Sequence, residues 1–146
     1  MVAEVTTFAF EGVDAREVTV QAHLSGGQPS FVIVGLPDKS VSEAKDRISA
    51  AFSALGLGLP PKRITVNLAP ADLRKEGSHF DLPIALALMA EMGAIPRDTV
   101  EGMAVIGELG LDGSIAKTTG ALPAAVAANG LHLGLVCSHA CGAEAA

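Results

Sequence analysis

The alternation of apolar and polar residues predicts three strands in the first quarter of the chain. Residues 2–10, VAEVTTFAF, are rich in β-branched and aromatic side chains, as strands usually are. Residues 17–24 alternate cleanly, which is typical of a strand with one buried face; the apolar positions are Val18, Val20, Ala22 and Leu24. Residues 30–35, SFVIVG, carry no charge and form a short apolar run. We therefore expect this third strand to be buried on both faces.

A helical period begins at residue 36 and ends before residue 61. Apolar residues recur every three or four positions, at Val41, Ala44, Ile48, Ala51, Phe52 and Leu55. Ser40 with Glu43 three residues later predicts a capping box at the start of this helix. Gly56 favours its end, and Pro60 prevents it from continuing.

The middle of the chain predicts a strand, a loop and a second helix. Residues 63–70, RITVNLAP, have strand composition, and residues 71–80, ADLRKEGSHF, read as a polar loop. Asp81 is a plausible N-cap for a helix over residues 82–92. This helix is apolar nearly all round, so we expect it to be deeply buried.

The last third predicts a hairpin, a helix and a strand. Residues 103–117 fit two strands around a turn at Asp112-Gly113, residues 118–130 fit an Ala-rich helix, and residues 131–137 fit a final strand. The pattern predicts one α+β domain over residues 1–146, in two layers, with the helices on one face of a sheet. The ending, CGAEAA, has no terminating feature, and we expect a boundary inside a longer protein.

Composition and charge narrow the function classes. The 146 residues are 49% hydrophobic, carry a net charge of −6 and include no Trp or Tyr. An acidic chain without these aromatics is poorly suited to a dedicated nucleic-acid domain or a base-stacking platform. Four basic residues are candidates for local contacts with DNA or with a neighbouring subunit: Lys62, Arg63, Arg74 and Lys75.

Other site classes have no matching pattern in the chain. The sequence has no phosphate-binding GxxxxGK[ST] motif and no acidic cluster at metal-ligand spacing, so we expect no nucleotide or metal in this fragment. Cys137 and Cys141 are expected to be free thiols, because the usual zinc spacing and further ligands are missing. The first residues do not fit a signal peptide, and the apolar run 82–90 is too short to span a membrane. We expect a cytoplasmic protein with no membrane partner.

The stretch KEGSHFDLP holds Ser78, His79 and Asp81, the three residue types of a hydrolytic triad. Triad residues converge in space and usually come from distant parts of the chain. Adjacent side chains in an extended loop point to opposite sides, so Ser78 and His79 are poorly placed to act on each other. We expect a structural loop in which Asp81 caps the helix, Gly77 permits a tight turn, and His79 bonds to backbone groups at the helix start. A contact loop for an anion, built on Arg74 and Lys75, is the alternative.

Three long segments, residues 31–51, 60–89 and 107–128, carry a resemblance. They are similar to the N-terminal domain of the ComM/YifB-type, magnesium-chelatase-like AAA+ ATPases. The resemblance implies a Lon protease-like domain with the fold of ribosomal protein S5 domain 2. It also implies a following AAA+ module, absent here, that binds ATP and magnesium and assembles as a hexamer. Members of the ComM type are DNA helicases that drive branch migration in natural transformation.

The resemblance to Lon-type proteases locates the catalytic positions. The nucleophile's position falls on His79 and the position of the lysine base on Pro123, so both members of the dyad are missing. The resemblance therefore implies a non-catalytic accessory domain whose partners are its own AAA+ module and neighbouring subunits, with DNA reached through the full-length protein. Two alternatives remain: an active serine peptidase that uses Ser78 in a register shifted by one residue, and a plain nucleic-acid-binding module like S5.

Overall fold

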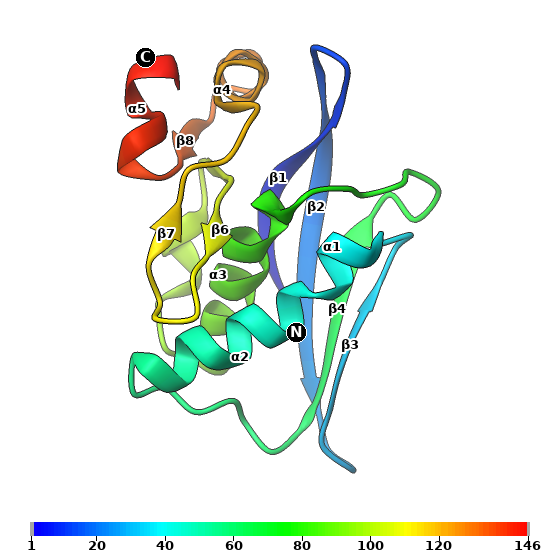
Figure 1. The fold of residues 1–146 in the computed structure, drawn as a ribbon. Coiled ribbons are helices and arrows are strands. Elements are labelled where there is room, and N and C mark those ends of the chain that lie inside the picture. Colours follow the sequence, from blue (N-terminus) through cyan, green and yellow to red (C-terminus); the bar gives the residue numbers. More distant parts are fainter. Residues whose placement is uncertain (1, 146) are drawn as a thin grey trace.

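A six-stranded mixed sheet forms the framework of the computed structural model, which describes residues 2–145 (Figure 1). The strand order is β3-β4-β2-β1-β5-β8. The strands are β1 (Ala3–Glu11), β2 (Asp14–Ser25), β3 (Ser30–Val34), β4 (Arg63–Ala69), β5 (Met103–Val105) and β8 (Gly134–Val136). The β1–β2 and β2–β4 pairs are antiparallel, whereas β3–β4, β1–β5 and β5–β8 are parallel. A separate two-stranded hairpin joins β6 (Glu108–Leu109) and β7 (Ile115–Ala116).

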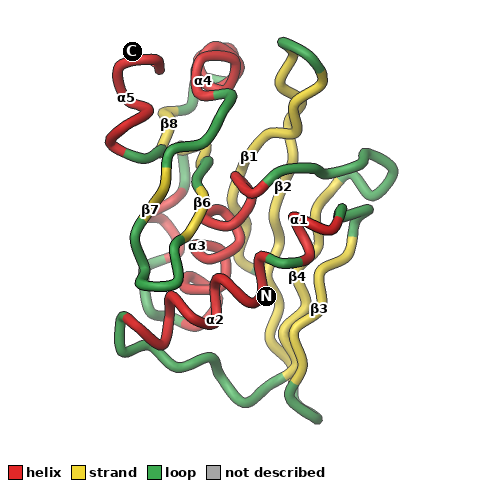
Figure 2. The backbone as a smooth tube through the Cα atoms, in the orientation of Figure 1, coloured by secondary structure: helices red, strands yellow, loops and turns green. Residues whose placement is uncertain are grey.

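Three helices, α2, α3 and α4, have about three turns each, and the others are shorter (Figure 2). The helices are α1 (Lys39–Ser42), α2 (Ala44–Ala54), α3 (Asp81–Met92), α4 (Ala121–Gly130) and α5 (Gly142–Ala145). Single 3₁₀ turns occur at η1 (Ser78–Phe80), η2 (Arg97–Val100) and η3 (His139–Cys141). The chain is thus an α+β protein, as the sequence pattern predicted, and its sheet is mixed. None of the helices in the described residues is long and apolar enough to cross a membrane.

The main core lies between the sheet and helices α2 and α3. The alternating residues of β2 point inward as predicted, with Val18, Val20 and Ala22 fully buried. They meet α3, whose Ile84 and Leu88 have no exposed surface. Burying each such aliphatic side chain contributes about 1.5–3 kcal/mol relative to leaving it in water. The prediction that residues 82–92 form a deeply buried helix is confirmed.

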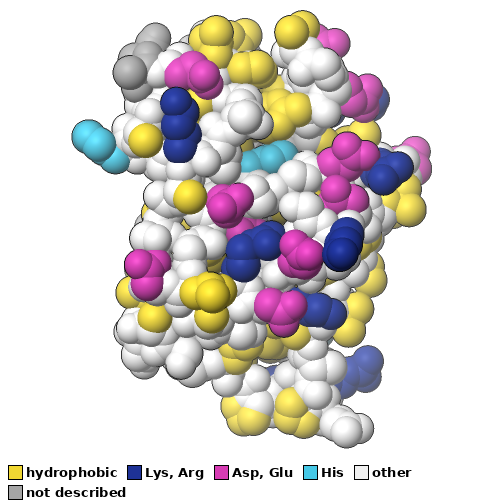
Figure 3. All heavy atoms as spheres, viewed as in Figure 1, with side chains coloured by type: hydrophobic (Ala, Val, Ile, Leu, Met, Phe, Trp, Pro, Cys, Tyr) yellow, Lys and Arg dark blue, Asp and Glu magenta, His cyan; other side chains and the backbone are white. Residues whose placement is uncertain are grey.

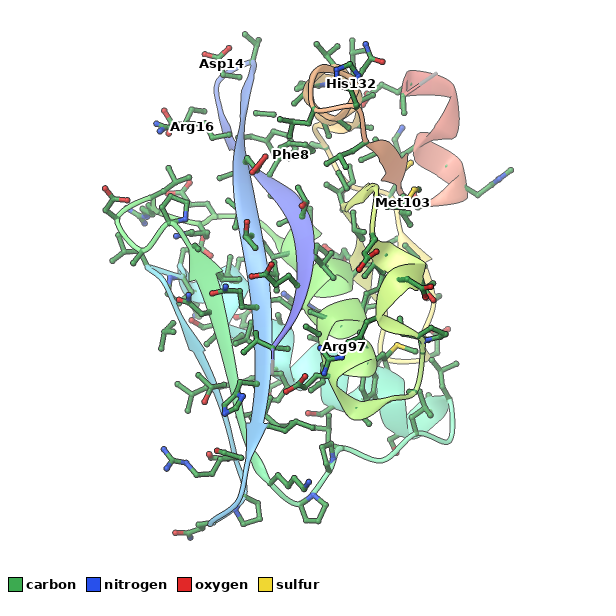
Figure 4. The ribbon with its side chains drawn as sticks, turned by 180° about the vertical axis from the view of Figure 1, so that it is seen from behind. Phe8, Asp14, Arg16, Arg97, Met103 and His132 are labelled. Carbon is green, nitrogen blue, oxygen red and sulfur yellow. The ribbon has the colours of Figure 1, made fainter. Side chains whose placement is uncertain are left out.

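A second, smaller core lies on the opposite face of the sheet and corrects the expectation that all helices share one face. Along a strand, neighbouring side chains point to opposite faces. Val105 belongs to the main core, whereas Ala104 and Ile106 on either side of it belong to a cluster with Phe8 of β1. Three small residues of α4 close this cluster: Ala121, Ala124 and Ala128. Helix α4 therefore covers the far face near the β1–β2 hairpin, the side on which Phe8 is labelled in Figure 4.

Strand β3 differs from its prediction. It is one of the two border strands of the sheet, and its Val32 and Val34 are 46% and 41% exposed. Its Phe31 and Ile33 face the main core. An apolar run of this length does not reveal whether the strand is central or at an edge, so the expectation of burial on both faces was wrong.

The first helix and the strands of residues 103–117 also differ from their predicted boundaries. The side chain of Asp38, not Ser40, caps the first helix by accepting a hydrogen bond from Val41 N at 2.8 Å, and the predicted long helix is divided at Glu43. Residues 103–117 hold three short strands rather than two, because β5 joins the main sheet before the hairpin begins. The hairpin itself is present, with Gly110 N donating to Ser114 O at 2.8 Å.

Candidate functional site

The segment that leads into α3 is fixed to the sheet rather than free. Lys75 N donates to Leu36 O at 3.0 Å, and Asp38 N donates to Lys75 O at 2.9 Å. These bonds extend the parallel β3–β4 pairing past the ends of both strands. The predicted polar loop is therefore anchored at its middle residue, Lys75, next to the starts of α1 and of η1.

Lys75 has no exposed surface, which corrects its prediction as a contact for DNA or a subunit. Its Nζ donates a hydrogen bond to the carbonyl oxygen of Pro70. Burial lowers the pKa of the Lys75 amine, and the charge of Asp72 acts in the opposite direction. The aliphatic stem fills space in the loop, and the amine satisfies a backbone carbonyl. A lysine held in this way cannot reach a phosphate group without rearrangement of the loop.

The other three candidate contact residues are exposed but do not form one patch. The Arg74 side chain is 72% exposed and pairs with Glu76 at 2.9 Å. Lys62 and Arg63 lie at the start of β4, and Arg74 lies beyond its end. Seven strand residues place the two ends of β4 about 20 Å apart. On the face seen in Figure 3, Lys and Arg side chains are mixed with Asp and Glu, without a continuous basic area.

His79 is a buried structural residue in η1. Its Nε2 lies 2.6 Å from the Phe8 carbonyl oxygen in β1, which requires a neutral ring that donates from Nε2 or a charged ring. Its ring centroid is 4.8 Å from that of Phe10 and 4.3 Å from that of Phe80. Burial lowers the pKa of His79, and the Phe8 carbonyl and Asp38 oppose this change. The neutral form that donates from Nε2 therefore fits the site. The sequence had suggested a hydrogen-bond partner at the start of the helix, but the partner is the Phe8 carbonyl in β1.

Ser78 and Gly77 precede this histidine. Gly77 has φ of 104°, so the prediction of a tight turn that needs glycine is confirmed. The backbone of Ser78 and His79 is a 3₁₀ turn and not the extended loop expected from the sequence. Ser78 is half-buried, and among the described residues its hydroxyl has no hydrogen bond to a histidine, lysine or carboxylate.

Asp81 does not cap α3; it forms a buried ion pair. Its carboxylate has no exposed surface and accepts hydrogen bonds from Arg47, with Nε at 2.6 Å from Oδ2 and Nη2 at 3.0 Å from Oδ1. Leu109 N donates to the same Oδ2 at 3.1 Å. Both carboxylate oxygens accept, which fits the ionised form. Burial raises the pKa of Asp81, against the hydrogen bonds from Arg47 and Leu109, and the bond to Asp81 raises the pKa of Arg47.

Arg47 also links the pair to α1, because its Nη2 donates to Ser40 O at 2.8 Å. The outer Nη1 lies 3.3 Å from Glu43. The ion pair thus joins α1, α2, α3 and β6 at the start of the buried helix. Arg47 was not predicted as a site residue, and its local signal is a charged residue directly beside Ile48 of the apolar stripe.

The position assigned to the catalytic lysine, Pro123, lies in the first turn of α4. The glycine before that helix, Gly120, has φ of 89°, and a Cβ there would lie 2.7 Å from the Phe10 ring. Since Phe10 also packs on His79, the start of α4 and the start of α3 meet at one aromatic ring. His79 supplies no serine hydroxyl and Pro123 supplies no lysine amine, so the serine–lysine pair of the proteases has no counterpart at these two positions.

The two cysteines belong to the smaller core, in which Cys141 packs with Phe8 and with Ala121 of α4, and Cys137 lies at the edge. Cys141 is buried and Cys137 is half-buried, and both are free. The Ser138 hydroxyl donates to Cys141 Sγ at 3.2 Å. Within residues 2–145, no cluster of three or more histidine, cysteine or acidic side chains has the geometry to hold a metal ion.

We expect the buried His79 to make stability depend on pH. The unfolded chain binds a proton at this residue near pH 6.5, whereas the folded chain, with its lowered pKa, resists protonation. Stability should therefore be complete above about pH 6.5 and fall as the pH drops below it, by at most about 1.4 kcal/mol per pH unit. Urea unfolding measured at a series of pH values would show this slope.

The matched control is His79→Gln, whose amide can still donate to Phe8 O but does not titrate. This variant should show a shallower slope over the same pH range. An unchanged slope in His79→Gln would assign the pH dependence to other groups.

Comparison with known proteins places this site in a family. Residues 20–139 match the family model described as subunit ChlI of Mg-chelatase. "Competence protein ComM" of Haemophilus influenzae is 46% identical over 117 residues, which is 80% of this chain and 23% of that protein. "Uncharacterized protein YifB" of Salmonella typhimurium is 44% identical over 126 residues, 86% of this chain and 25% of that protein. The YifB protein of Escherichia coli is 44% identical over 124 residues, or 85% and 24%.

The chain spans about a quarter of the length of these relatives. The match runs from the middle of β2 to the first residue of η3, and so includes the buried ion pair, His79 and the start of α4. The chain belongs to the magnesium-chelatase-like family of subunit ChlI, in which ComM and YifB are its relatives.

Proposed function

We propose that the chain is a non-catalytic N-terminal accessory domain of a hexameric AAA+ ATPase that resembles the ComM DNA helicases, which promote branch migration in natural transformation. One observation carries the proposal. In a chain 46% identical to ComM, the expected nucleophile position is His79, which is buried and hydrogen-bonded to the Phe8 carbonyl. A side chain committed to the fold in this way is not available for chemistry.

The rest of the site supports the same function. Nucleophilic catalysis by serine needs a base within hydrogen-bond reach, and the Ser78 hydroxyl contacts none among the described residues. Lys75 is the lysine closest along the chain, and its amine is bonded to Pro70 O. The arrangement of a buried α3 against a mixed sheet agrees with the Lon-like, S5 domain 2-like fold that we propose for residues 1–146.

The Arg47–Asp81 pair suggests what the accessory domain contributes. It joins the starts of two helical segments to the β6–β7 hairpin through one buried and two partly buried hydrogen bonds, which favour a rigid unit. Such a unit can support ring assembly, while ATP and magnesium bind in the AAA+ module that follows in the full-length protein. We place this protein in the cytoplasm.

Direct DNA contact by this domain plays a small part in the proposal. The net charge is −6, and the exposed Arg74 is separated from Lys62 and Arg63 by the length of β4. Contacts made by these residues would be to phosphates and would not depend on sequence.

The test compares the full-length protein with a version that begins after residue 146. We expect the truncated protein to retain some ATP hydrolysis but to lose branch migration of a synthetic DNA junction. Adding the separate domain should not restore branch migration, because the proposed support of the ring depends on the covalent connection. Branch migration and hexamer formation that are unchanged by the truncation would contradict the accessory role.

A second expected result concerns the peptidase alternative. Ser78 should not react with a fluorophosphonate probe, because an isolated serine hydroxyl is a poor nucleophile. Ser78→Ala should also leave ATP hydrolysis and branch migration of the full-length protein unchanged. Mass spectrometry of the probe-treated protein measures the labelling, with a known serine hydrolase as the positive control. Labelling that is lost in Ser78→Ala would identify an active peptidase instead.

A further inference from the structure

Strand β3 borders the main sheet and offers backbone hydrogen-bonding groups on its outer side. In a strand, the backbone groups of alternate residues point to opposite edges. Ser30 N donates to Lys62 O, next to β4, and the register with β4 is uninterrupted from Ser30 to Val34, so the backbone groups of the even-numbered residues face β4. The N–H and C=O groups of Phe31 and Ile33 consequently point away from the sheet. Figure 1 shows β3 at one border of the sheet, and no other strand of residues 2–145 lies on its outer side.

This edge lacks the usual protection against pairing. Proteins commonly protect border strands with charged residues, proline or a bulge. The five residues Ser30–Val34 contain neither charge nor proline, and they pair with β4 in an uninterrupted register. Val32 and Val34 also present apolar surface on the uncovered face, at 46% and 41% exposure. The segment combines free backbone groups with apolar side chains, which is the chemistry that binds another extended strand.

We propose that β3 is a self-association edge, at which two copies of the chain pair their β3 strands antiparallel about a twofold axis at Val32. The register follows from the direction of the free groups. In an antiparallel pair, residues whose groups point across the gap must face each other to exchange both of their bonds. A twofold axis at Val32 sets Phe31 opposite Ile33 of the second copy, and Ile33 opposite Phe31. Both pairs are then hydrogen-bonded.

The same register brings the apolar side chains together. Val32 faces Val32 of the second copy in a non-hydrogen-bonded pair, the type in which side chains approach most closely. Ser30 faces Val34 of the second copy. On the other face, the partly buried Phe31 and Ile33 lie beside each other across the axis and extend the main core of each copy. The strand is therefore complementary to itself, and a second copy satisfies both its backbone and its side chains.

The contact is small, so we expect reversible association. Stable dimers commonly bury about 1,200–2,000 Å² in total, and one pair of five-residue strands provides less. Trapping by a disulfide bond suits such an equilibrium, because it records the register as well as the association.

The experiment uses single cysteine variants of the whole chain under mild oxidation. Val32→Cys should form a disulfide-linked dimer, because facing residues of a non-hydrogen-bonded pair have Cα atoms about 4.5 Å apart, within disulfide range. Val34→Cys is the matched control: it lies on the same face of the same strand with similar exposure. Its two copies would be about 13 Å apart in this register, too far to join. We expect at least about tenfold more linked dimer from Val32→Cys than from Val34→Cys.

A mixture of Ser30→Cys and Val34→Cys chains tests the register independently. Each variant alone should give little disulfide-linked dimer, and the mixture should give the linked heterodimer. Cys137 and Cys141 are present in every variant, so their background is the same. Equal linking of Val32→Cys and Val34→Cys, or a mixture that gives no heterodimer, would overturn the proposal. Pairing with a strand of some other protein would likewise leave Val32→Cys unlinked in the purified chain.

Discussion

Asp81→Ala should lower the free energy of unfolding by about 3–5 kcal/mol, the loss found when one member of a buried ion pair is removed. The substitution leaves the Arg47 guanidinium facing a cavity without its carboxylate, and it leaves Leu109 N without an acceptor. A helix cap of the kind expected from the sequence would contribute only about 1 kcal/mol. Thermal and urea unfolding of the variant and the unchanged chain would separate the two values.

Three further variants locate the effect. Glu43→Ala removes the outer, half-exposed partner of Arg47 and should cost less than about 1 kcal/mol. Asp81→Asn retains the size of the side chain and an acceptor for Leu109, so its loss should be intermediate. The double change Arg47→Met with Asp81→Leu removes both charges and should recover much of the stability lost in Asp81→Ala. A loss near 1 kcal/mol in Asp81→Ala, with no recovery in the double variant, would restore the capping interpretation.

The spacing of apolar and polar residues predicted those strands, helices and turns that depend on neighbouring residues in the sequence. The alternation in β2 and the apolar helix α3 were visible because the spacing of the side chains reports directly which face is buried. The turn at Gly77 and the hairpin around Asp112-Gly113 follow from residue chemistry alone.

The misplaced site residues all depend on contacts between distant segments. Lys75 belongs to a polar stretch, and its burial follows from pairing with Leu36 and Asp38, which lie almost forty positions earlier. Asp81 meets Arg47 across 34 positions. The local spacing of apolar and polar residues does not indicate which distant residues will pair. The resemblance located His79 and Pro123 at the catalytic positions, but the structure was needed to bring His79 and the start of α4 together at Phe10.

The wrong prediction that β3 is buried on both faces also comes from information that local sequence does not contain. A run such as SFVIV is equally compatible with a central strand and with a border strand, because only the sheet order decides which it is. The order places β3 next to β4 alone, and this leaves the outer backbone groups on which self-association would depend.

Gly35→Ala should be the other strongly destabilising change, by about 3 kcal/mol or more from backbone strain and overpacking together. Gly35 has φ of 108°, a conformation that residues with a Cβ rarely adopt. A Cβ at this position would also lie 2.3 Å from the carbonyl oxygen of Leu68 in the neighbouring strand. A backbone oxygen cannot turn aside as a flexible side chain can, so β3 and β4 must separate locally.

Gly26→Ala is the matched control, because Gly26 lies in the preceding turn with open space around its Cα and without a positive φ. It should change stability by no more than about 0.5 kcal/mol. Separation of β3 from β4 at Gly35 should also weaken the bond from Lys75 N to Leu36 O, since Leu36 is the next residue. Amide hydrogen exchange at Lys75 should therefore be faster in Gly35→Ala than in Gly26→Ala, even under conditions where both remain folded. Equal exchange and equal stability in the two variants would mean that the strands tolerate the added methyl group, and that the segment leading to α3 is not held by the close approach at Gly35.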